Sequence, residues 1–71
     1  MEVGGQYVHY KHLEAIYFVT GLAILEATEE ACVLYQSKDT GITFIRPVAS
    51  WLETVIVDGV SVPRFKKYIE A

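Results

Sequence analysis

The chain has 71 residues, which is enough for one small domain. A chain of this size buries only about 60% of the surface of its unfolded form, yet 52% of its residues are hydrophobic. Nine acidic against six basic side chains give a net charge of −3, which disfavours nucleic acid as the partner. We therefore expect a single domain over residues 1–71, with a core at 5–65 and a C-terminal tail at 66–71. We also expect a homo-oligomer, because association would cover the apolar excess.

The sequence also bears on location. Cys32 is the single cysteine, so no intrachain disulfide can form. No apolar run approaches the roughly 20 residues of a membrane helix, and no secretory leader is recognisable. We expect a cytoplasmic protein without a membrane partner.

The first predicted strand covers residues 6–11. Alternation would place Tyr7 and His9 on one face and Tyr10 on the other. Neither face is purely apolar, which is typical of an edge strand. Residues 12–14 read as a turn.

The next two predicted strands cover residues 15–25 and 30–36. The centre of the first is β-branched and aromatic, which favours a strand. Gly21 in its middle predicts a bulge or a bend, and residues 26–29 form a polar connection. A helix over 22–34 is the competing prediction, because Ala, Leu and Glu are frequent there.

A fourth strand is predicted over residues 42–46, after a turn at 37–41. Pro47 would end it, because proline cannot donate to a strand ladder. Residues 48–52 are predicted to form one short helical or 3-10 turn.

The clearest local signal is a hairpin over residues 54–63. Asp58 and Gly59 suit the positive φ angles of a type I′ turn, which would pair Val57 with Val60. Residues 64–71 are predicted to be a tail that docks through Phe65 and Tyr68.

These elements predict an all-β fold of five to six short antiparallel strands with one short helical or 3-10 turn. Closure into a small barrel would remove the exposed strand edges. We expect an SH3-like barrel, and an OB-like barrel is the alternative.

The sequence resembles a small bacterial family, domain of unknown function 1653, over most of its length. The matching motifs are Gly5, Tyr7, His9, Tyr10 and Lys11; Tyr17, Val19, Gly21 and Ala23; Thr28, Glu30, Val33 and Tyr35; Arg46, Pro47, Trp51, Glu53 and Val55; and Asp58, Gly59, Val62, Pro63, Arg64 and Phe65. The chain departs from the family pattern at four places: His12, Leu25, Phe44 and Ser50-Trp51. The resemblance implies a small β-barrel-like domain and no assigned activity.

Arg46 has apolar neighbours on both sides, Ile45 and Pro47, and its role has two interpretations. Its planar guanidinium suits a carboxylate or phosphate ligand. The favoured prediction is a structural ion pair with Glu53 across the 47–52 turn, because a half-buried arginine usually has a partner.

Other candidate groups favour binding over catalysis. His9 and His12 would face opposite ways in one strand, and a zinc site would need more ligands than they supply, so no metal or cofactor is predicted. Cys32 reads as a buried free thiol. Trp51 either plugs one end of the barrel or anchors an exposed aromatic surface.

We predict a non-enzymatic, self-associating binding module for a protein, peptide or small ligand. The alternatives are a nucleic-acid-binding barrel that uses the tyrosines and residues 64–67, or a small enzyme that uses Cys32 or His9. The predicted ligand- or partner-binding residues are Tyr7, His9, Tyr10, Tyr35, Arg46 and Trp51.

Overall fold

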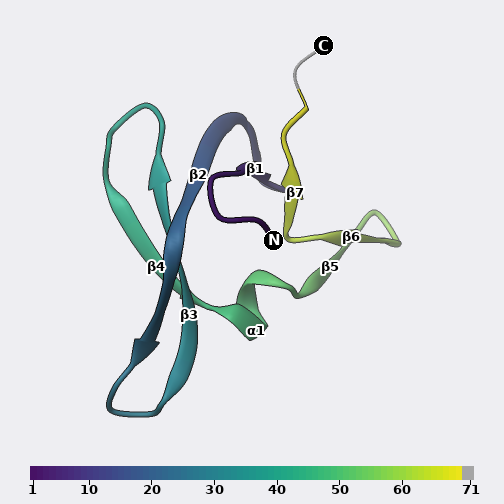
Figure 1. Ribbon diagram of the computed structural model, residues 1–71. Coiled ribbons are helices and arrows are strands. Elements are labelled where there is room, and N and C mark those ends of the chain that lie inside the picture. The colour runs from purple at the N-terminus through teal and green to yellow at the C-terminus, as the bar shows by residue number, and fades with distance from the viewer. Residues whose placement is uncertain (70–71) are drawn as a thin grey trace.

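The computed structural model describes residues 1–69 and consists mainly of antiparallel strands (Figure 1). In chain order the elements are β1 (Gln6–His9), β2 (His12–Leu25), β3 (Glu30–Ser37), β4 (Thr43–Pro47), α1 (Val48–Trp51), β5 (Thr54–Val57), β6 (Val60–Pro63) and β7 (Phe65–Lys67). The predicted all-β fold with one short helical turn is confirmed, with seven strands where five to six were expected.

The strands form an open sheet and a separate hairpin. Five strands pair in the order β4-β3-β2-β1-β7, and β5 pairs only with β6. Within residues 1–69 the end strands β4 and β7 do not pair with each other, so the predicted closed barrel is not formed. The chain leaves β4 through α1 and the β5–β6 hairpin before it returns as β7, which keeps the two end strands apart (Figure 1).

Local sequence signals account for most strand boundaries. The register of β2 against β3 shifts between Val19 and Gly21, which confirms the predicted irregularity at Gly21. The helix that competed over residues 22–34 does not form. Instead the chain turns after Leu25, whose carbonyl accepts hydrogen bonds from the backbone of Thr28 and Glu29 at 3.3 and 2.7 Å.

The turn between β1 and β2 is tighter than predicted. β2 begins at His12, and His9 and His12 are partners in the ladder, so the turn lies at Tyr10 and Lys11 and not at residues 12–14. The two histidines therefore lie beside each other. A continuous strand through residue 11 would have separated them.

The β5–β6 hairpin forms as predicted. Val57 pairs with Val60, and Asp58 and Gly59 have φ angles of 51° and 77°. Both angles are positive, as a type I′ turn requires.

The predicted tail is in part a strand. Phe65–Lys67 forms β7, which pairs antiparallel with β1, and the backbone of Tyr68 donates to the carbonyl of Gln6 at 2.8 Å. Sequence alone could not reveal this pairing, because its partner strand lies at the other end of the chain.

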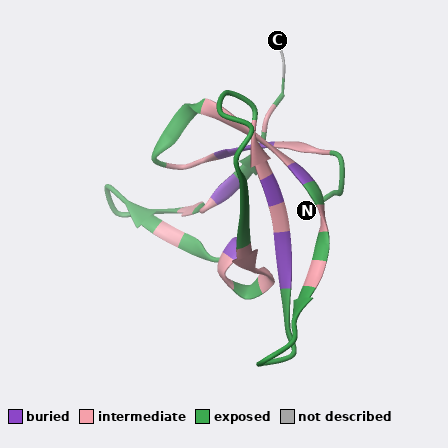
Figure 2. Ribbon diagram, turned by 90° about the vertical axis from the view of Figure 1, so that its left-hand side faces the viewer, coloured by how far each residue is buried: buried purple, intermediate pink, exposed green. Residues whose placement is uncertain are grey.

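The core lies where the central strands meet α1. The buried cluster is formed by Tyr7, Val19, Val33, Tyr35, Trp51 and Phe65. Figure 2 shows that buried positions are few and central, while the ends of the hairpins are exposed. No helix in residues 1–69 has the length and hydropathy of a bilayer-crossing segment.

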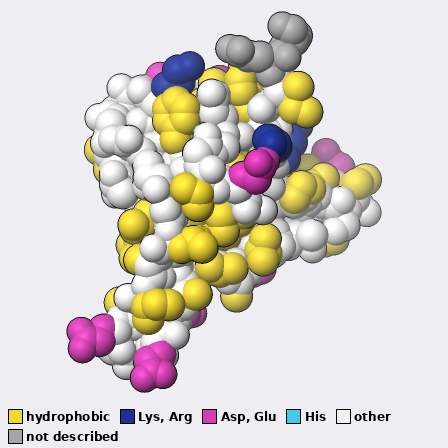
Figure 3. All heavy atoms as spheres, viewed as in Figure 1, with side chains coloured by type: hydrophobic (Ala, Val, Ile, Leu, Met, Phe, Trp, Pro, Cys, Tyr) yellow, Lys and Arg dark blue, Asp and Glu magenta, His cyan; other side chains and the backbone are white. Residues whose placement is uncertain are grey.

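Many apolar side chains remain on the surface. On the face drawn in Figure 3 they extend from the body of the molecule along the projecting β2–β3 hairpin, whose tip carries acidic groups. Leu22, Ile24 and Leu25 on β2 are exposed. The apolar excess of the sequence is therefore not fully buried by one copy of residues 1–69.

Candidate functional site

A pocket of about 220 Å³ is lined by residues from all five strands of the larger sheet. It is lined by His9, His12, Tyr17, Tyr35, Phe44, Arg46 and Phe65. Four aromatic rings and three basic side chains therefore share one concave surface.

Strand register builds the aromatic wall of the pocket. Tyr35 on β3 lies opposite Phe44 on β4, and their rings stack with centroids 5.6 Å apart and an interplanar angle of 28°. The ring of Tyr17 on β2 meets the ring of Tyr35 edge-on, at 5.5 Å. Phe44 is exposed, so one face of the wall is available to a ligand.

The floor of the pocket is a stacked pair of rings. Phe65 lies parallel to Trp51, with centroids 3.8 Å apart and an interplanar angle of 5°. Phe65 also meets the rings of Tyr35 and His9 edge-on, at 5.6 and 5.0 Å. Trp51 lies beneath this layer and is buried, so it does not present an exposed aromatic surface.

Arg46 enters the pocket from β4. Alternation along the strand places it on the same face as Phe44. Its Nε donates to the hydroxyl of Tyr35 at 3.4 Å, and its Nη1 donates to the hydroxyl of Ser50 at 3.0 Å. The guanidinium also lies 5.3 Å from the ring centroid of Phe65. These contacts hold the guanidinium with neutral partners.

The predicted ion pair between Arg46 and Glu53 is wrong. Glu53 pairs instead with Arg64, with 3.6 Å between Oε2 and Nη2. The cause is the β5–β6 hairpin, because its closure brings residues 53 and 64 together and the Arg64 amide donates to the Glu53 carbonyl at 2.9 Å. Arg46 forms no ion pair with any carboxylate in residues 1–69.

The histidines complete the basic rim. His9 and His12 have ring centroids 6.1 Å apart, and His9 Nδ1 accepts a hydrogen bond from the Lys11 amide at 3.2 Å. Partial burial lowers the pKa of His9, and the positive charges of Arg46, Arg64, His12 and Lys11 lower it further. Across residues 1–69 no group of three or more His, Cys, Asp or Glu side chains is arranged to hold a metal ion.

The structure brings together only part of the predicted site. His9, Tyr35 and Arg46 line the pocket. The ring of Tyr10 lies tilted against that of His9, with centroids 4.6 Å apart, but Tyr10 does not line the pocket. Trp51 lies in the core.

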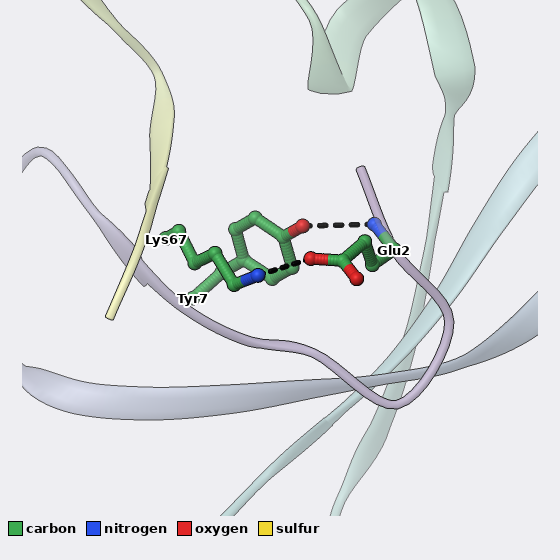
Figure 4. A network of polar contacts seen from close by, with 3 residues as sticks. All are labelled: Glu2, Tyr7 and Lys67. Atoms are coloured by element: carbon green, nitrogen blue, oxygen red, sulfur yellow. Dashed lines mark hydrogen bonds and ion pairs between the residues drawn. The ribbon is translucent and has the colours of Figure 1, made fainter. Parts of the chain in front are cut away.

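Tyr7 does not line the pocket and instead forms a hydrogen bond with the N-terminal segment. Its ring is buried and meets Trp51 edge-on at 5.4 Å. Its hydroxyl accepts a hydrogen bond from the Glu2 amide at 2.8 Å, and the Glu2 carboxylate pairs with Lys67 (Figure 4). The hydrogen bond and the charge of Lys67 lower the pKa of Glu2.

Sequence reasoning missed four lining residues: His12, Tyr17, Phe44 and Phe65. A signal for Phe44 was present, because it lies two residues from Arg46 in a predicted strand and must share its face. No such signal exists for His12 or Phe65. His12 falls in the turn predicted at residues 12–14, and Phe65 falls in the predicted tail. Cys32 is buried as predicted.

The comparisons with known proteins agree with this architecture. Residues 5–67 match the model of a family described as a protein of unknown function, DUF1653. The chain is 33% identical to a DUF1653 protein of known crystal structure from Bordetella bronchiseptica, with a TM-score of 0.74. That match covers 93% of this chain and 85% of the other. No curated protein matches the chain. The chain therefore belongs to the DUF1653 family.

Proposed function

We propose that this chain is a non-enzymatic, self-associating binding module. Its pocket would capture a small ligand in which a carboxylate or phosphate is joined to a flat apolar group. The observation that carries this proposal is Arg46, which projects into an aromatic pocket without a carboxylate partner from residues 1–69.

The anionic part of the ligand follows from the guanidinium. Two of its nitrogens are held by Tyr35 and Ser50, which fixes the plane of the group. Nη2 makes no hydrogen bond with residues 1–69, so its two donors are free for an anion. A guanidinium that is already oriented loses little freedom when it binds a carboxylate or phosphate, and His9 and His12 add polar groups at the same rim.

The flat part of the ligand follows from the rings. Phe44 stacks on Tyr35 and remains exposed, so a planar group can lie against it. Such ring contacts contribute about 0.5–1.5 kcal/mol beyond the burial of area. Together with one charge-assisted contact, they give a minimal one-ring probe an expected dissociation constant of about 1 mM.

The same residues support binding more than catalysis. Cys32, the one thiol, is buried and does not line the pocket. The Nδ1 atom of His9 already accepts a hydrogen bond from the Lys11 amide. The pocket-lining residues thus contain no nucleophile beside a base, which is the arrangement that covalent catalysis needs.

The basic residues near the C-terminus give little support to the nucleic-acid alternative. Arg64 pairs with Glu53, and Lys67 pairs with Glu2. Two of the three bases that could hold a nucleic-acid backbone therefore already have acidic partners. A short single-stranded oligonucleotide tests this alternative directly, through binding that weakens as salt rises.

The proposal is tested by NMR titration of the protein with phenyl phosphate and with benzoate. Benzyl alcohol and inorganic phosphate are the controls, because each supplies only half of the ligand chemistry. We expect shifts at Phe44, Arg46 and Phe65, with both anionic aromatic probes binding at least about tenfold more tightly than either control.

Matched variants separate the pocket from general charge effects. Arg46→Gln removes the guanidinium, and Lys38→Gln removes one positive charge from the exposed β3–β4 turn. Arg46→Gln should abolish binding while Lys38→Gln binds like the wild type. A folded Arg46→Gln protein that binds phenyl phosphate as tightly as the wild type would overturn the proposal, as would the absence of pocket shifts with both probes.

A further inference from the structure

Strand β4 lies at the open edge of the five-stranded sheet. The order β4-β3-β2-β1-β7 gives it one neighbouring strand, β3. Its other main contact is with α1, at its C-terminal end. Figure 1 shows β4 at the margin of the molecule, and in Figure 2 it runs across the side that faces the viewer with no strand in front of it.

The direction of the free backbone groups on this edge follows from the ladder. The Ser37 amide donates to the Ile42 carbonyl at 2.9 Å, so Ile42 directs its backbone groups toward β3. Successive residues of a strand alternate in this respect. Phe44 and Arg46 therefore also bond to β3, while Thr43 and Ile45 direct their N–H and C=O groups outward.

Along residues 42–45 the edge lacks the usual protection against pairing, and the charge and the proline of β4 come only at its end, at Arg46 and Pro47. Residues 42–45 contain no charge and no proline, and Ile42, Phe44 and Ile45 are 54%, 41% and 56% exposed. Folded proteins usually cover, charge or bend such an edge. A partner strand is the simplest cover for this one.

We propose that two copies of the chain pair through β4, antiparallel and about a two-fold axis at Phe44. Thr43 would lie opposite Ile45 of the partner subunit, and the two-fold axis would place Ile45 opposite Thr43 of the partner subunit. The outward N–H and C=O groups of both residues would then all be hydrogen-bonded on each edge. This inference rests on the proposed self-association and does not depend on ligand binding.

The edge is complementary to itself, which favours a second copy over a foreign peptide. The two-fold axis places Phe44 opposite Phe44 of the partner subunit, at a closely spaced position where aromatic pairs stabilise sheets. Arg46 would lie opposite Ile42 of the partner subunit, so no like charges meet. Pro47 falls at a hydrogen-bonding position and has no N–H, which ends the pairing there.

The pairing would also extend the pocket. Phe44 lines the pocket and has an exposed ring. Cross-strand neighbours lie on the same face of a sheet. Phe44 of the partner subunit would therefore lie at the mouth of the pocket and add a second aromatic surface to it.

Sedimentation velocity and cysteine cross-linking test this interface. Wild-type protein should sediment as a dimer with about twice the chain mass of 8.0 kDa. Thr43→Pro removes an outward N–H and should raise the dimer dissociation constant at least about tenfold, because two symmetry-related bonds are lost. Ile24→Lys, on an exposed part of β2 away from the edge, is the control and should leave the dimer unchanged.

Phe44→Cys tests the register. Residues opposite each other at a non-hydrogen-bonded position have Cα atoms about 4.5 Å apart, which a disulfide can span. We expect Phe44→Cys to form an intermolecular disulfide on mild oxidation, while Ile24→Cys does not.

The outcomes separate the interface from self-association itself. A wild-type protein that is monomeric at all concentrations overturns self-association and this interface together. A dimer that survives Thr43→Pro, dissociates with Ile24→Lys and shows no Phe44→Cys disulfide overturns only the β4 interface, and points to the exposed apolar surface of the β2–β3 hairpin. These experiments are run without phenyl phosphate, so their outcomes are independent of whether the pocket binds it.

Discussion

Truncation of Phe65 to alanine should remove a large part of the stability of this domain. The side chain is 7% exposed, stacks on Trp51 at 3.8 Å and lies in β7. Replacement of a buried phenylalanine by alanine costs about 3–5 kcal/mol, because apolar contacts are lost and a cavity remains. A domain of 71 residues has a total stability of about 4–10 kcal/mol. Phe65→Ala should therefore remove at least about a third of the free energy of unfolding.

Urea denaturation followed by tryptophan fluorescence measures this effect. Trp51 is the single tryptophan and contacts Phe65 directly, so the signal reports on the same part of the core. With a slope of about 1 kcal/mol per M urea, the midpoint should fall by roughly 3–5 M. Ile69→Ala, an exposed site just beyond β7, is the control and should shift stability by less than about 0.5 kcal/mol. A Phe65→Ala protein as stable as this control would refute the assignment of Phe65 to the core.

Two further perturbations probe the turn chemistry and the pocket. Gly59→Ala places a side chain at a φ angle of 77° and should cost about 1–2 kcal/mol in urea denaturation. Gly21→Ala should be close to neutral, since its φ is not positive and no atom lies within 4 Å of the added Cβ; equal costs for both would contradict the turn assignment. The fold disfavours the protonated ring of His9 and so lowers its pKa. The contribution of His9 to the free energy of unfolding should therefore be complete at pH values above 6.5, the ordinary pKa of histidine, and should be lost as the pH falls below that value. The urea midpoint of the wild type should decrease between pH 7 and pH 5, and His9→Gln should make this decrease smaller. An equal decrease in the variant would show that a group other than His9 causes it.

The sequence predicted the parts of the fold that local chemistry determines. Asp58 and Gly59 specify a turn whose positive φ angles few other residue pairs adopt, and the hairpin register follows from it. Gly21 marked the irregularity in β2, and Pro47 marks the last residue of β4. These features depend on a few neighbouring residues, so they can be predicted without knowledge of the sheet.

Features that depend on strand order could not be predicted in the same way. Phe65 reaches the pocket because β7 pairs with β1, a contact between the two ends of the chain. Glu53 was assigned to Arg46 because the two are near in sequence, but the hairpin brings Arg64 to it instead. Barrel closure failed as a prediction for a related reason, since local strand signals do not specify whether the first and last strands of a sheet meet.

The candidate site was predicted in part, because His9, Tyr35 and Arg46 line the pocket and were named from sequence. Tyr35 pairs with Phe44 and Arg46 pairs with Val33, so Tyr35 and Arg46 are diagonal neighbours across the β3–β4 ladder. The same alternation separates the two roles proposed for β4. Side chains of Phe44 and Arg46 face the pocket, while the free backbone groups of Thr43 and Ile45 face the edge. A substitution that blocks the edge backbone at Thr43 should thus leave Arg46 in place, because its hydrogen bonds run to Tyr35 and Ser50 within one copy of the chain.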